Sequence, residues 1–178
     1  MTRRGLLLLA AGAARAEEVA APPGYRTEDY RAPTPGEVPG GRAIDTDGAR
    51  QLFGRPGVVW VDVLPAARRP EGLPAGTLWR PSPRLGIPGS LWLPEAGRGA
   101  PPPEVEAWFR DTLAQATGGD LDRPVVFYCL ADCWMSWNAA RRAALWGYRA
   151  VHWYRDGTDG WEAAGLPTEA LHPTPGAP

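Results

Sequence analysis

The two cysteines of this 178-residue chain, Cys129 and Cys133, are the residues best suited to covalent chemistry. Cys129 directly follows the apolar run 125–128, and a helical pattern begins shortly after Cys133. At such a strand–loop–helix junction, backbone N–H groups and the positive end of the helix dipole stabilise a thiolate. We therefore expect any thiol chemistry of this protein to occur in this loop.

The first sixteen residues have the three parts of a secretory signal peptide. Arg3 and Arg4 supply positive charge, residues 6–14 are apolar, and residues 14–16 give a small-x-small cleavage pattern. The apolar run is too short to remain as a membrane span. We expect residues 1–16 to be removed and the mature protein to be periplasmic, with no membrane span after cleavage. In that oxidising space, a Cys129–Cys133 disulfide becomes an alternative to two free thiols.

Composition excludes several other kinds of chemistry. The net charge of -1 gives no sign of nucleic acid or an anionic membrane as partner. All 19 basic residues are arginine, which excludes a lysine Schiff base and a P-loop lysine. Two cysteines without a nearby histidine make a poor zinc site, and His152 and His172 are far along the chain. We therefore expect no bound metal.

The elements that must position the cysteine loop follow from hydrophobic periodicity and from turn residues. Helices are predicted over 46–53, 103–117, 136–146 and 158–164, and strands over 58–63, 78–80, 91–93, 125–128 and 151–154. Strands that alternate with helices predict an α/β domain with a mainly parallel central sheet flanked by helices, whose ligand sites lie at the strand carboxyl ends. Residues 17–42 are predicted to be an extended Pro/Gly-rich arm, 43–167 a single domain, and 168–178 a flexible tail.

Three separated stretches resemble the rhodanese-like domain family. Residues 59–63 resemble its first strand with an aspartate, 86–94 its "HIPGA" signature with Gly86 in place of histidine, and 156–167 its closing "GG…W…AGLP" motif. Their order matches that of the family, and Cys129 falls where the family carries its nucleophilic cysteine. The resemblance implies a rhodanese-like single domain and a sulfurtransferase in which Cys129 carries a sulfane sulfur to a thiol acceptor.

A narrower resemblance concerns the exported PQQ-dependent catabolism-associated CXXCW motif family. It is carried by residues 24–33, 129–140 and 156–161, although this chain has three residues between its cysteines instead of two. The resemblance implies an accessory protein of a quinoprotein alcohol oxidation system, with a periplasmic quinoprotein dehydrogenase or its cytochrome as partner. PQQ is then implied only in that dehydrogenase, and we expect no cofactor on this chain.

The predicted active-site loop lacks the arginine that the family usually carries near its end. Besides the two catalytic candidates Cys129 and Cys133, the loop consists of Leu130, Ala131, Asp132, Trp134, Met135 and Ser136. None of these side chains is a cation that pairs with an anionic donor such as thiosulfate, which favours a specialised role over general thiosulfate sulfurtransferase activity.

Two interpretations of Cys133 remain open. It is either a resolving thiol that attacks Cys129, or an outward-facing residue that contacts a partner together with Trp134 and Trp137. Those tryptophans and Arg141 are the predicted partner or substrate contacts. Three functions therefore remain: sulfane sulfur or persulfide handling on Cys129, thiol–disulfide exchange through both cysteines, and a non-catalytic partner-binding module.

Overall fold

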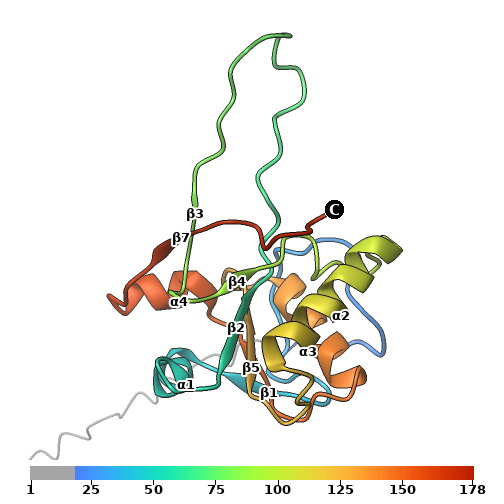
Figure 1. Ribbon diagram of the computed structural model, residues 1–178, viewed down its shortest axis with the longest axis vertical. Coiled ribbons are helices and arrows are strands. Elements are labelled where there is room, and N and C mark those ends of the chain that lie inside the picture. The colour runs from blue at the N-terminus through green and yellow to red at the C-terminus, as the bar shows by residue number, and fades with distance from the viewer. Residues whose placement is uncertain (1–18) are drawn as a thin grey trace, which may run out of the picture.

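Five parallel strands form the central sheet of the computed structural model, which describes residues 19–178 (Figure 1). The predicted signal peptide, residues 1–16, lies outside the described residues. In spatial order the strands are β1 (Arg42–Ile44), β6 (Val151–Tyr154), β5 (Val125–Tyr128), β2 (Val59–Asp62) and β4 (Leu91–Trp92). Every neighbouring pair runs parallel, so the carboxyl ends of all five strands lie at one edge.

Helices cover both faces of this sheet. They are α1 (Thr46–Leu52), α2 (Pro103–Thr117), α3 (Trp134–Leu145) and α4 (Gly157–Ala163). Successive side chains of β5 point to opposite faces: Val125 and Phe127 pack with α2 and α3, whereas Val126 and Tyr128 pack with α1 and α4. The predicted α/β fold with a mainly parallel sheet between helices is confirmed.

Local sequence signals determine where the helices begin and end. The Asp45 side chain accepts a hydrogen bond from the backbone N–H of Gly48 and caps α1. Gly118 ends α2 with a φ of 66°, in the left-handed region that favours glycine. The four predicted helices are all present, with bounds that differ from the predicted ones by at most two residues.

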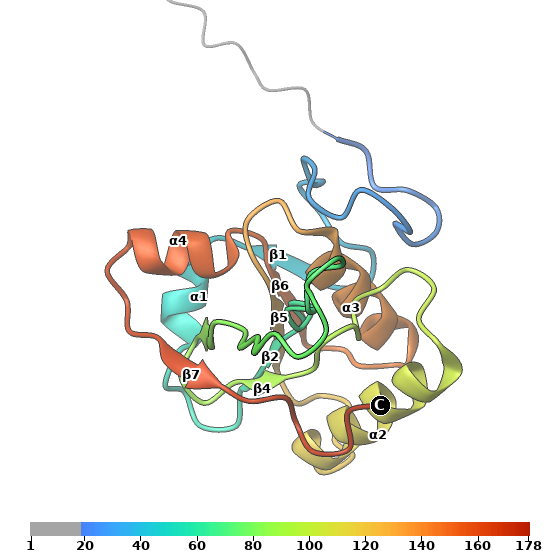
Figure 2. The ribbon, with the colours of Figure 1, turned by 90° about the horizontal axis from the view of Figure 1, so that it is seen from above.

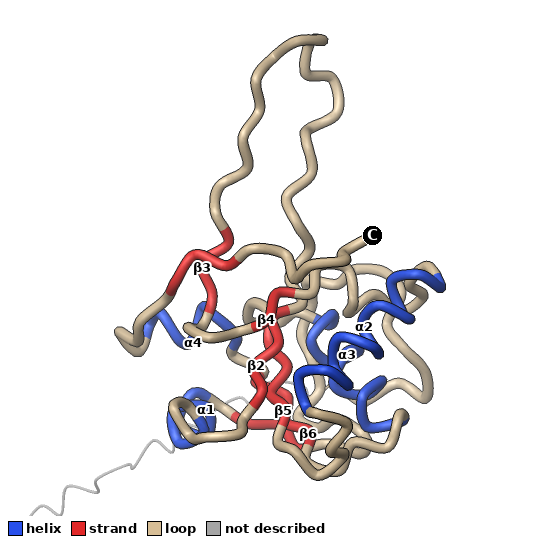
Figure 3. Tube along the Cα trace, viewed as in Figure 1, coloured by secondary structure: helices blue, strands red, loops and turns tan. Residues whose placement is uncertain are grey.

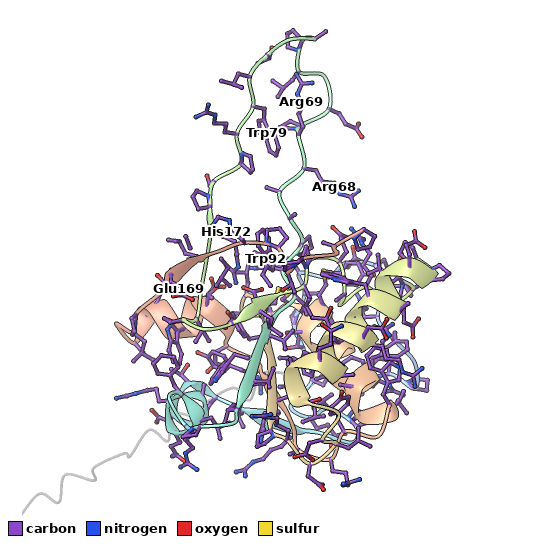
Figure 4. All side chains as sticks on the ribbon, in the orientation of Figure 1. Arg68, Arg69, Trp79, Trp92, Glu169 and His172 are labelled. Carbon is purple, nitrogen blue, oxygen red and sulfur yellow. A yellow bond between two sulfur atoms is a disulfide. The ribbon has the colours of Figure 1, made fainter. Side chains whose placement is uncertain are left out.

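The predicted strand over 78–80 is wrong. Residues 64–83 instead form a long loop that projects from the body, with Arg68, Arg69 and Trp79 carried away from the sheet (Figures 3 and 4). Prolines at 81 and 83 have no N–H to donate, which opposes strand pairing there. The strand in this region is β3 (Arg84–Gly86), directly after the loop.

The segment 168–178, expected to be a flexible tail, contains the strand β7 (Glu169–Leu171). It pairs antiparallel with β3 in a second, two-stranded sheet. Beyond β7, the N–H of Thr174 donates to the carbonyl of Trp92 at 2.9 Å, and Trp108 Nε1 donates to the carbonyl of Pro175 at 3.1 Å. The tail therefore packs along the body of the domain.

Candidate functional site

Cys129 and Cys133 lie at the carboxyl edge of the sheet and are joined by a disulfide. Cys129 follows β5 directly, and Cys133 is the N-cap residue of α3. Their Cα atoms are 6.2 Å apart, within the usual range for a disulfide. Both residues are buried, with 0% and 3% of their surface exposed. Cys133 therefore faces Cys129 and not the solvent.

The loop between the cysteines is held on one side by α4 and on the other by the arm. The Ala131 N–H donates to the Asp159 carboxylate at 3.0 Å, and the Asp132 carbonyl accepts from the N–H of Ala32 at 3.1 Å. Asp132 has a φ of 51°, a left-handed conformation that aspartate tolerates better than most residues. Because the Ala131 N–H donates to Asp159, it does not donate to a sulfur anion in this state.

The carbonyl oxygen of Cys129 is the most heavily bonded group of the loop. It accepts from the Thr158 N–H at 3.0 Å, from Thr158 Oγ1 at 3.3 Å and from Arg84 Nη2 at 3.5 Å. Gly157 permits this close approach, since a Cβ there would lie 2.6 Å from the Cys129 oxygen and its φ is +55°. The peptide after Cys129 is therefore held in one orientation.

Arg84 supplies a cation beside the loop from a distant part of the sequence. Its Nε donates to the Asp62 carboxylate at 2.6 Å, and the Asp62 side chain is fully buried at the end of β2. Burial raises the pKa of Asp62 from 3.8 to about 6, against the lowering effects of Arg84 and of the Leu64 N–H. The ion pair joins the two ends of the projecting loop and places the guanidinium against Cys129.

Sequence reasoning looked for an arginine within the cysteine loop and therefore missed Arg84, which lies 45 positions before Cys129. The available signal is its place directly before the segment 86–94, which resembles a family signature. A charged residue that follows a long Pro-rich loop gives no indication on its own that it packs against a cysteine.

A cavity of about 310 Å³ lies beside the Cys129 peptide, at the base of the projecting loop. Its walls include Leu64 and Arg84 from the base of that loop, Leu130 from the cysteine loop, and Thr158, Asp159 and Glu162 from α4. Two carboxylates thus accompany one guanidinium that is already paired with Asp62. This charge balance disfavours small multiply charged anions.

The arm lies on the α3 side of the molecule (Figure 2). Backbone contacts with the neighbours of Cys133 place it over this cysteine. Arg31 lies opposite Cys133 in an isolated antiparallel bridge. On either side of this pair, Trp134 N–H donates to the Tyr30 carbonyl at 2.9 Å and Ala32 N–H donates to the Asp132 carbonyl at 3.1 Å. The disulfide is therefore shielded from solvent by backbone pairing.

The predicted contact residues Trp134, Trp137 and Arg141 hold this arm and do not form an open surface. Trp134 is 2% exposed and Trp137 is fully buried. Trp137 Nε1 donates to the Glu37 carbonyl at 2.9 Å, and Arg141 Nη1 donates to the Pro22 carbonyl at 3.0 Å. The prediction of a docking surface at the tryptophans disagrees with their burial, because sequence alone did not show that the arm would fold over them.

The remaining loop residues Met135 and Ser136 support the start of α3. Met135, in the first turn of α3, is buried in the core cluster that also contains residues of α2. Ser136 Oγ donates to the Cys133 carbonyl at 3.0 Å and accepts from Trp153 Nε1 at 3.0 Å. These contacts tie the second cysteine to β6.

Within residues 19–178, none of the helices is long and apolar enough to span a lipid bilayer. The same residues contain no group of three or more histidine, cysteine, aspartate or glutamate side chains suited to hold a metal ion.

Comparison with known proteins shows a family match over most of the domain. The sequence profile described as Rhodanese-like domain matches residues 45–164. No curated protein matches the chain in sequence.

Several solved structures have a similar fold. The polysulfide-sulfur transferase homodimer of Wolinella succinogenes is 19% identical, with a TM-score of 0.46 over 73% of this chain and 79% of that one. The Alr3790 protein of Anabaena sp. is 18% identical, with a TM-score of 0.44 over 72% and 80% of the two chains. An anaerobic ergothioneine biosynthesis enzyme of Chlorobium limicola, in complex with trimethyl histidine, is 21% identical. Its TM-score is 0.49 over 80% of this chain and 34% of that one. At these identities the similarity concerns the fold alone.

Proposed function

Because the chain belongs to the rhodanese-like domain family, we propose that it accepts a sulfane sulfur on Cys129 and releases it through Cys133. The observation that carries the proposal is the disulfide between these cysteines, located in the loop where this family holds its nucleophile. A resolving cysteine within bonding distance converts a sulfur carrier into a protein that discharges its sulfur by itself.

The first step transfers sulfur to Cys129. The Cys129 thiolate attacks the outer sulfur of a donor persulfide, a new S–S bond forms on Cys129, and the donor's own S–S bond breaks. The donor leaves as a thiolate, and Cys129 carries the persulfide.

The second step discharges the persulfide. The Cys133 thiolate attacks Sγ of Cys129, which forms the Cys129–Cys133 disulfide and expels hydrosulfide. The disulfide in the structure corresponds to the product of this step. A dithiol of a partner protein then supplies the two electrons that return both cysteines to thiols.

The charge around the site favours the persulfide of an organic thiol as donor over thiosulfate. The loop itself carries no arginine, and Arg84 is already paired with Asp62. Asp159 and Glu162 add negative charge to the cavity wall, which repels a dianion.

A second candidate is thiol–disulfide exchange without sulfur transfer. The observation that favours it is the same disulfide, since a dithiol partner reduces it whether or not a persulfide preceded it. The two functions differ in one respect: only sulfur transfer puts an additional sulfur atom on Cys129.

For the cellular setting we propose the periplasm and an accessory role in a quinoprotein alcohol oxidation system, with the dehydrogenase or its cytochrome as partner. The support is the signal-like sequence of residues 1–16 and the resemblance of 24–33, 129–140 and 156–161 to an exported family. The test is fractionation of the native host, followed by co-purification of the dehydrogenase with the wild-type chain and with a variant lacking both cysteines.

Trapping the sulfur-loaded state tests the chemical proposal. A Cys133→Ser variant incubated with a persulfide donor is expected to retain one additional sulfur atom on Cys129, seen by intact mass. The Cys129→Ser variant, which keeps Cys133, is the matched control and is expected to gain none. An equal gain in both variants would contradict the assignment of Cys129 as the acceptor.

A further inference from the structure

The contact between the arm and the cysteine loop has the geometry of a substrate held for disulfide exchange. Arg31 and Cys133 face each other between two backbone hydrogen bonds and share none directly. In such a non-hydrogen-bonded antiparallel pair the Cα atoms are about 4.5 Å apart and the side chains are closest. A disulfide spans Cα atoms separated by about 4.4 to 6.8 Å. A cysteine at the Arg31 position would therefore lie within bonding reach of Cys133.

We propose that the backbone edge 132–134 is the docking site for an extended, cysteine-bearing segment of a reducing partner protein. The partner segment takes the place of residues 30–32 of the arm and puts its cysteine where Arg31 now lies. This inference rests on the proposed function, because it assigns the binding mode of the dithiol protein that reduces the Cys129–Cys133 disulfide.

In the exchange step the partner bonds to Cys133 and releases Cys129. The partner thiolate attacks Sγ of Cys133, the bond between partner and Cys133 forms, and the Cys129–Cys133 bond breaks. Cys129 leaves as a thiolate at the end of β5, which is the form that attacks a sulfur donor. A second thiol of the partner then attacks the sulfur of the partner's first cysteine in the mixed disulfide. The partner's own disulfide forms, and Cys133 leaves as a thiolate.

The backbone contacts define what the partner segment requires. The residue at the Tyr30 position has only to offer a carbonyl, which Trp134 N–H binds. The residue at the Ala32 position must offer an N–H to the Asp132 carbonyl, so it is any residue except proline. The site thus selects an extended segment with a cysteine followed by a non-proline residue.

The arm must leave this edge before the partner binds. Other contacts of the arm also hold it on the domain. The Asn138 side chain holds Arg26 through two hydrogen bonds, of 3.0 and 2.8 Å. Tyr30 accepts a hydrogen bond at its hydroxyl from the Gly99 N–H at 3.1 Å. With Asn138 and Arg26 still joined, residues 30–32 must lose their two backbone bonds, the Tyr30–Gly99 hydrogen bond and the Arg31–Asp159 ion pair to expose Cys133.

Peptides that copy residues 26–34 test the proposal, each activated at its cysteine as a mixed disulfide with an aromatic thiol. The first peptide carries Arg31→Cys, the second Tyr30→Cys, and the third Arg31→Cys with Ala32→Pro. Each is mixed with the Cys129→Ser protein, and the rate at which Cys133 displaces the aromatic thiol is followed by absorbance. Peptide mapping then locates the new disulfide.

The first peptide is expected to react about tenfold faster than the second, whose cysteine points to the opposite face of the segment. The third is expected to react about fivefold more slowly than the first, because it lacks one backbone hydrogen bond worth about 1 kcal/mol. Equal rates for the three peptides would overturn the proposal. Loosening the arm of the protein by Ala32→Pro should raise the rate of the first peptide, whereas Arg80→Ala, on the exposed projecting loop, should not.

These rates are independent of sulfur uptake by Cys129, which is serine in the test protein. If the peptides react at different rates but no sulfur is gained from a donor, the docking site is supported and the proposed function is wrong. If sulfur is gained but the peptides react at equal rates, the proposed function is supported and the docking site is wrong.

Discussion

The backbone N–H of Thr158 donates a 3.0 Å hydrogen bond to the carbonyl oxygen of Cys129. This bond ties α4, from the end of the domain, to the loop that follows β5. Gly157 lies directly before Thr158, and its position against the Cys129–Leu130 peptide leaves no room for a side chain. The shape of the cysteine loop therefore depends on a glycine that lies 28 positions further along the chain.

The substitution Gly157→Ala is expected to lower the free energy of unfolding by about 3 kcal/mol or more. Part of this loss is the left-handed backbone, about 1–2 kcal/mol for a residue with a Cβ, and the rest is the clash with the Cys129 carbonyl. Gly89→Ala is the matched control, because Gly89 also has a positive φ, of +78°, but nothing lies within 4 Å of its added Cβ. Urea unfolding of both variants measures the difference, and equal losses would contradict the packing described.

Removal of the Arg84 guanidinium is expected to destabilise the fold by about 3–5 kcal/mol, because Arg84→Met leaves the Asp62 carboxylate buried without its partner. Arg80→Met, on the exposed side of the same loop, is expected to change stability by less than about 0.5 kcal/mol. The measurement is chemical denaturation at neutral pH. A loss at Arg84 no larger than that at Arg80 would show that the ion pair does not anchor the loop.

Asp62 gives the domain a specific dependence on pH. Its pKa rises from 3.8 to about 6 on folding, so between these values the native state holds a proton that the unfolded state has released. Its contribution to the free energy of unfolding is therefore full below pH 4, falls as the pH rises, and is lost above about pH 6. Two pKa units correspond to about 3 kcal/mol.

The comparison with Asp62→Asn isolates this group, because the other carboxylates titrate alike in both proteins. The stability of the wild type relative to the variant should fall by about 3 kcal/mol between pH 4 and pH 7. A relative stability that rises over this range would mean that Arg84 lowers the pKa of Asp62 more than burial raises it.

Periodicity predicted the elements that build the domain, because β5 and the four helices bury apolar residues in regular patterns. The cysteine loop was located for the same reason, since Cys129 comes where such a pattern ends. Contacts between distant segments were not predictable in this way. Arg84 reaches Cys129 across the base of a Pro-rich loop, and residues 30–32 of an apparently featureless arm pair with Cys133 through backbone atoms.

Short pairings at the ends of the domain were missed for a related reason. The strands β1, β3 and β7 are three residues each, which is too short for an alternating pattern to stand out. The burial of Trp134 and Trp137 depends on the arm as well, so two tryptophans beside a cysteine indicate an exposed surface when only the local sequence is considered. Their side chains instead pack together with ring centroids 5.2 Å apart.

The clamp at Asn138 should control how easily the disulfide is reduced. Asn138→Ala removes both hydrogen bonds to Arg26 and is expected to raise the rate of reduction by dithiothreitol several-fold, since each lost bond is worth about 1 kcal/mol. Asn138 also donates to the Gly97 carbonyl, so circular dichroism must first show that the variant is folded. Arg50→Ala, on the exposed surface of α1, is the control and should leave the rate unchanged. Equal rates for the two variants would show that the arm does not control access to Cys133.

The central claim, that Cys129 accepts sulfur and Cys133 discharges it, is tested most directly on the reduced wild-type protein. One equivalent of a persulfide donor is added, and hydrosulfide release and intact mass are followed together. The account predicts a transient mass gain of one sulfur atom, then about one hydrosulfide for each protein molecule and a final mass lower by two hydrogens, because the disulfide re-forms after Cys129 has carried the sulfur. Free cysteines of unchanged mass and no released hydrosulfide would contradict it.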